Sequence, residues 1–126
     1  MEKPMQPAIP LVRARRFELV DEHGRVRAVL GDIGRPGPFA PGLSLQDPEG
    51  HERTAYALYP KGPELVFVAD GNEVLNVGLD DESASPNNES GFTSRVVLSD
   101  ASGRPCVRIY VLYDGGTSWE VAGERH

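Results

Sequence analysis

The 126-residue chain has a single cysteine, a single tryptophan and no long apolar run. One cysteine excludes an intramolecular disulfide, so packing alone has to stabilise the fold. No apolar stretch approaches the ~20 residues that a membrane-spanning helix needs. The first ten residues also lack the apolar segment and the small-residue cleavage site of a secretory signal. We therefore expect a cytoplasmic protein without a membrane contact.

Helix-forming patterns and positive charge are scarce as well. No run free of Gly and Pro places apolar residues at i, i+3, i+4 and i+7, and the 14 Gly and 11 Pro exceed the usual share. The chain has 13 Lys and Arg against 19 Asp and Glu, a formal net charge of −6. An acidic chain is poorly suited to the phosphate backbone of a nucleic acid, so we expect no such partner.

A repeated hairpin pattern is what the chain does contain. In Phe17–Gly31 an alternating apolar segment leads into Asp21-Glu-His-Gly24, and a second alternating segment leads out. Alternation at period two is typical of a strand, an Asp at the first turn position accepts backbone N–H groups, and a Gly supplies a positive φ. The pattern predicts a β-hairpin.

Degraded copies of this pattern follow at Leu43–Gly50, Val66–Gly71, Val96–Gly103 and, as a half-copy, Trp119–Gly123. They predict an all-β meander of about nine antiparallel strands from four to five hairpin repeats, closed as a barrel or as a sandwich. The expected strands lie near 14–20, 25–31, 43–46, 52–58, 64–69, 73–79, 94–99, 104–113 and 117–122. We expect one domain at 13–126, preceded by a flexible N-terminal arm at 1–12.

Acidic side chains offer the first candidates for a binding site. Asp21, Asp47, Asp70 and Asp100 occupy equivalent turns and should line one rim, where carboxylates could hold Ca²⁺. The simpler interpretation is that each Asp caps its own turn. The polar loop 80–91 gathers further oxygen ligands, but without the spacing of a known cation site. We predict no metal and no cofactor.

Residues with catalytic chemistry form no recognisable constellation. His23 and His51 lie beside turns and His126 ends the chain, which favours exposed histidines over a metal site. Cys106 has no neighbouring His or basic run to activate a thiolate. No nucleophile-elbow, phosphate-loop or paired-carboxylate pattern is present, so we predict a protein that is not an enzyme.

A local basic patch stands out against the acidic composition. Its members are Arg13, Arg15, Arg16, Arg25 and Arg27. Cross-strand pairing with Glu18 is the simpler explanation for these charges. The alternative is a phosphate- or carboxylate-rich partner, such as the acidic rim of a second copy.

The segment Val107–Tyr113 is apolar on both sides, which points to a contact with another chain. Strand alternation turns Val107 inward and Tyr110 and Leu112 outward. We take Val107, Tyr110 and Leu112 as candidate interface residues of a homo-oligomer or larger assembly. The alternative is a small module that binds a glycan or a small apolar ligand on a platform of Tyr56, Tyr110 and Trp119.

Two arginines extend the hairpin motif. Arg27 and Arg53 each lie three residues after the glycine of their turn, giving apolar-x-apolar-x-Asp-x-x-Gly-x-x-Arg. This pattern resembles the repeats of uncharacterised bacterial β-hairpin-repeat proteins, and the resemblance implies a hairpin architecture and a bacterial or phage origin, with no activity attached. The sequence therefore favours a non-enzymatic structural or assembly protein that uses an exposed apolar strand and its N-terminal arm for subunit or scaffold contacts.

Overall fold

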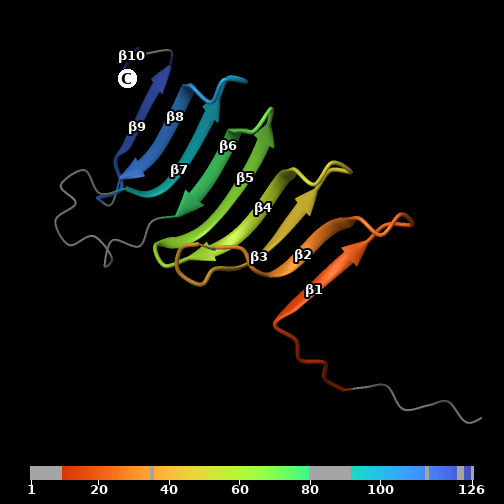
Figure 1. Cartoon of the computed structure of the whole chain (residues 1–126). Helices are drawn as coiled ribbons and strands as arrows, with labels where there is room; N and C mark the ends of the chain where they lie inside the picture. Colours follow the sequence, from red (N-terminus) through yellow and green to blue (C-terminus); the bar gives the residue numbers. More distant parts are fainter. Residues whose placement is uncertain (1–9, 35, 80–91, 113, 122–123, 126) are drawn as a thin grey trace, which may run out of the picture.

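The protein forms one antiparallel sheet whose strands lie side by side in sequence order (Figure 1). The computed structural model describes residues 10–34, 36–79, 92–112, 114–121 and 124–125. The strands are β1 (Arg16–Val20), β2 (Val26–Asp32), β3 (Pro41–Gln46), β4 (Glu52–Tyr59), β5 (Gly62–Ala69), β6 (Asn72–Leu79), β7 (Phe92–Ser99), β8 (Pro105–Leu112), β9 (Thr117–Val121) and β10 (Glu124–Arg125). The all-β antiparallel meander predicted from the sequence is confirmed. The predicted arm at 1–12 and the loop 80–91 fall largely outside the described residues.

The sheet is open, which corrects the expected closure as a barrel or a sandwich. Each strand pairs only with its neighbours in sequence, and β1 and β10 are the two ends of the sheet. A sandwich needs connections that carry the chain to a second layer, whereas all of these strands lie in one layer (Figure 1). Among the residues that the structure describes, no helix is long and apolar enough to span a membrane.

Three hairpins close with the same turn. In β1–β2 the Gly24 N–H donates to the Asp21 carbonyl at 3.0 Å, and the Asp21 N–H donates to the Arg25 carbonyl at 3.0 Å. Gly24 has a φ of +78°, which favours glycine and gives the three-residue hairpin loop with a bulge. The turns that begin at Asp47 and Asp100 repeat both hydrogen bonds. The Asp-x-x-Gly motif is thus the turn itself.

The motif arginines join successive hairpins. A register shift leaves Arg27 and Arg53 as the extra residues of bulges just after their turns. The Arg27 Nε donates to the Gln46 carbonyl at 2.9 Å, and the Arg53 Nε donates to the Val68 carbonyl at 2.9 Å. Each guanidinium therefore ties its own hairpin to a carbonyl near the end of a strand in the next hairpin.

The buried core of the described chain is small and lies on one face of the sheet. A Cβ on Gly42 would meet the Ile33 side chain at 2.7 Å, so the β2–β3 loop covers this face. Figure 1 shows that loop beside the ends of β3 and β4. The buried apolar residues are Val29, Ala40, Ala55, Ala57 and Val66. Three of the five are alanines, so the single chain buries few large side chains.

Candidate functional site

The opposite face of the sheet is apolar from one end to the other. The strand register places one residue of every strand from β1 to β9 in a single central row. The row consists of Phe17, Leu30, Leu43, Tyr56, Leu65, Val77, Val96, Ile109 and Trp119. All nine are apolar or aromatic, because the period-two alternation stays in phase across the sheet.

A second row runs parallel to the first, on the side of the Asp turns. It consists of Leu19, Ala28, Leu45, Thr54, Phe67, Leu75, Leu98, Val107 and Val121. Thr54 is its one polar member, and the Thr54 hydroxyl donates to the Val66 carbonyl at 2.9 Å. Neither row contains a charged residue. We call the two rows, together with Leu58, Leu79 and Val111, the apolar face.

This face is open to solvent in the single chain. Tyr56 is 58% exposed and Trp119 is 42% exposed. Eight strand spacings of ~4.8 Å and strands of five to eight residues at ~3.3 Å each give a footprint of roughly 650–1,000 Å². The largest apolar patch on a typical monomer is ~300–600 Å². This footprint is that of the whole sheet, and the apolar face occupies most of it, so the apolar face lies at or above the upper end of the range for ordinary patches.

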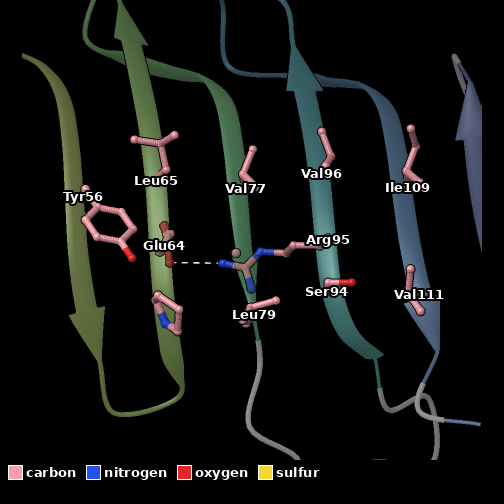
Figure 2. Close-up of a pocket in the computed structure, with 12 residues that line it drawn as sticks. Tyr56, Glu64, Leu65, Val77, Leu79, Ser94, Arg95, Val96, Ile109 and Val111 are labelled. Carbon is pink, nitrogen blue, oxygen red and sulfur yellow. Dashed lines mark hydrogen bonds and ion pairs between the residues drawn. The ribbon is translucent and has the colours of Figure 1, made fainter. Parts of the chain in front are cut away.

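A shallow hollow interrupts the apolar face between β4 and β8. Figure 2 shows Tyr56, Val77 and Ile109 around it, and Ser94 beside Leu79 at one end. The cavity measures about 330 Å³ and is largely open. The short Ser94 side chain stands in register with Leu79, which lowers the surface there. The surface of the hollow is mainly apolar, although Tyr56, Glu64, Ser94 and Arg95 are also among the residues that line it.

The other side of the sheet carries the charges and also holds the small buried core, since Ala57 stands opposite Glu64. We call this side the polar face. Glu64, Gly78 and Arg95 stand opposite one another on β5, β6 and β7. Because Gly78 has no side chain, the guanidinium of Arg95 crosses β6 and reaches Glu64 at 3.0 Å (Figure 2). The Nε of Arg95 also donates to the Asn76 Oδ1 at 2.9 Å. The two faces therefore differ sharply in charge.

The candidate interface residues from the sequence do not share one surface. Val107 lies on the apolar face, in register with Leu98 and Val121. Tyr110 lies on the polar face, opposite Arg95. Leu112 is half-buried at the end of β8. Strand alternation separates Val107 from Tyr110, so these three residues cannot form a single contact.

The candidate ligand platform is divided as well. Tyr56 and Trp119 share the central row, but they stand on β4 and β9, five strand spacings or about 24 Å apart. Tyr110 is on the other face. The structure therefore does not bring these three aromatic rings together around one small ligand.

Three of the four aspartates expected along the acidic rim cap their own turns, namely Asp21, Asp47 and Asp100, whereas Asp70 lies in the tight β5–β6 turn with a φ of +52°. The Oδ1 atom of Asp47 accepts the N–H groups of Glu49 at 3.0 Å and His51 at 2.9 Å. The hydrogen bond from the His51 backbone, opposed by desolvation, holds the pKa of Asp47 below its usual value. Asp21 and Asp100 accept the equivalent bonds. Within the described ranges no group of three or more His, Cys, Asp or Glu could hold a metal ion.

The remaining candidates lie in ordinary surroundings. His23 and His51 are exposed beside their turns, and His126 lies outside the described residues. The Cys106 thiol is 3.5 Å from the Arg104 carbonyl. Arg16 forms an ion pair with Glu18 of its own strand at 3.2 Å, while Arg25 pairs with Asp21 at 2.9 Å. The basic patch thus pairs mainly with its own hairpin.

The alternation in the sequence identifies the residues of the apolar face. The expected barrel or sandwich would have enclosed them in an internal core. One signal in the sequence could have shown otherwise, because no helix pattern and no second set of strands is left over to cover them. The fold and its surfaces define a protein with a single open sheet, apolar on one face and charged on the other. In comparisons with known proteins, no family model, no curated protein and no solved structure matches this chain.

Proposed function

We propose that the chain is a non-enzymatic structural or assembly protein whose apolar face makes permanent contact with another layer of protein. The observation that carries this proposal is the uncharged, exposed apolar face, which spans nine strands. Apolar surface of this extent in water is unfavourable by roughly 25 cal/mol for each Å². A covered state is therefore favoured over the isolated sheet.

The small internal core supports the same proposal. The described part of the chain buries five apolar residues, three of them alanines. Proteins are stable by only ~5–15 kcal/mol, which is the margin between apolar burial and the loss of chain entropy. A sheet that leaves its larger side chains in water needs a second layer to reach that margin.

A small binding module is the second candidate, and the hollow on the apolar face favours it. Its volume of about 330 Å³ falls at the low end of the range for ligand pockets. The hollow is open and apolar, so a small apolar ligand suits it better than a glycan, which needs hydrogen-bonding groups. Such a ligand would cover only part of the face, and we therefore rank this function second.

The single tryptophan gives a direct test of the assembly function. Trp119 lies on the apolar face and is 42% exposed in the isolated chain. If the chain is an assembly protein, the fluorescence of Trp119 should be shielded from acrylamide while the assembly is intact and should become quenchable when the assembly dissociates. A monomer whose Trp119 is shielded at every concentration would mean that the chain covers its own face, and would overturn the proposal. A monomer whose emission shifts only with an apolar ligand would favour the binding module.

A further inference from the structure

We infer that the layer covering the apolar face is a second copy of this chain, packed face to face. This inference rests on the proposed assembly function and names its partner. The competing occupants of the apolar face are the N-terminal arm and a foreign protein. The competing contact site between two copies is the edge strand β1. The area of the apolar face, its lack of charge and its core-like composition favour the second copy.

The area of the face matches what a stable dimer buries. Standard protein interfaces bury ~800 Å² on each partner. The footprint of roughly 650–1,000 Å² derived from the strand spacing brackets this value. Two sheets of equal size can cover each other fully at the usual separation of ~10 Å, with their strands ~30° apart. A single extended arm would cover only a fraction of nine strands.

Charge also permits two copies to meet through this face. The two complete rows hold no charged side chain, so the contact brings no like charges together. The ion pairs Glu64–Arg95 and Arg108–Glu120 stand on the polar face and remain in water in such a dimer. The net charge of −6 disfavours an anionic lipid surface as the alternative occupant.

The composition of the face resembles half of a domain interior. Permanent dimers have interfaces as apolar as a core cut in two, whereas transient partners meet through mixed polar surfaces. Leu and Val supply eleven of the eighteen residues in the two rows, and Thr54 has already satisfied its hydroxyl within its own sheet. In a two-fold contact both copies use the same patch, and residue i of one copy contacts residue j of the other and the reverse, so one uniform apolar surface is complementary to itself.

The test compares charged variants of two aromatic residues that are both more than half exposed. Tyr56→Glu places a carboxylate on the apolar face, where Tyr56 is 58% exposed. Phe39→Glu is the matched control, because Phe39 is 68% exposed and lies in the β2–β3 loop. Val77→Lys is a second face variant and guards against a folding defect particular to Tyr56. Circular dichroism checks that each variant keeps its sheet.

The readouts are light-scattering mass and acrylamide quenching of Trp119 over a dilution series. We expect the wild type and Phe39→Glu to have twice the chain mass of 13.7 kDa, with Trp119 shielded. Tyr56→Glu and Val77→Lys should raise the dissociation constant by at least ~100-fold, since both copies bury an uncompensated charge.

The other outcomes separate this inference from the proposed function. A folded monomer with an exposed Trp119 at all concentrations overturns the second copy but leaves the face open for another protein. A monomer with a shielded Trp119 overturns both the inference and the proposed function. A dimer that survives both face variants must use another surface, such as the edge of β1, and overturns the inference. A mass other than two chains also overturns it.

Discussion

The ion pair across β6 should make a measurable contribution to stability. Arg95→Met removes the guanidinium but keeps an unbranched stem over Gly78. The variant loses the contact to Glu64 at 3.0 Å and the hydrogen bond to Asn76 at 2.9 Å. Both ends of the ion pair are poorly exposed, at 16% for Arg95 and 23% for Glu64. Water therefore screens the pair less than it screens a surface pair.

The expected loss lies between that of a surface pair and that of a fully buried one. Exposed pairs contribute ~0–1 kcal/mol, and breaking a buried pair costs ~3–5 kcal/mol. We expect Arg95→Met to lower the free energy of unfolding by about 2 kcal/mol, or the melting temperature by roughly 6–12 °C. Arg16→Met is the control, because the Arg16–Glu18 pair is 54% and 40% exposed and should contribute less than ~1 kcal/mol.

The assay is urea unfolding at one fixed chain concentration, because dissociation of an assembly would otherwise shift the midpoint. The double variant Glu64→Gln/Arg95→Met should recover about half of the loss, since it removes the unpaired carboxylate. Equal losses for Arg95→Met and Arg16→Met would contradict a stabilising role of the Arg95–Glu64 pair, and so would a loss below ~0.5 kcal/mol for Arg95→Met.

Three further predictions concern the same face and the turns. Gly78→Ala places a Cβ 2.7 Å from the Arg95 Nη2, so it should displace the guanidinium and cost ~1–2 kcal/mol in the same assay; unchanged stability contradicts this. Arg53→Ala removes the hydrogen bond to the Val68 carbonyl and should lower the free energy of unfolding by ~0.5–1.5 kcal/mol; no loss would mean that this bond does not stabilise the fold. The pKa of Asp47 lies below 3.8 in the fold, so its ionised form stabilises fully above about pH 5. The stability gap between wild type and Asp47→Asn should then shrink as the pH falls below about 4, and a gap independent of pH contradicts this.

The local structure could be predicted from the sequence because its causes are local. The Asp21 turn follows from an Asp and a Gly three residues apart, and alternation alone placed Val107 and Tyr110 on opposite sides of β8. Most of the strand order follows because a short turn forces the next strand to lie beside the last. The longer connections, 33–40 and 80–91, impose no such order by their length. These features need only neighbouring residues to be known.

The layering and the long-range contacts could not be predicted in the same way. Alternation identifies a face that avoids water, but it does not tell whether the same chain or another one covers it. The sequence reasoning therefore assumed closure within the chain, and it grouped Tyr110 with Val107 as one interface. The contact of Arg95 with Glu64 joins residues 31 positions apart, and it depends on the register that places Gly78 between them.

The solution mass of the unmodified chain shows whether a second copy covers the apolar face. Light scattering over a dilution series, with acrylamide quenching of Trp119 recorded on the same samples, measures the mass and the cover of the apolar face together. We expect twice the 13.7 kDa chain mass with a shielded Trp119, and both the doubled mass and the shielding should be lost together on dilution. A folded chain of 13.7 kDa at every concentration would contradict the claim that a second copy covers the sheet.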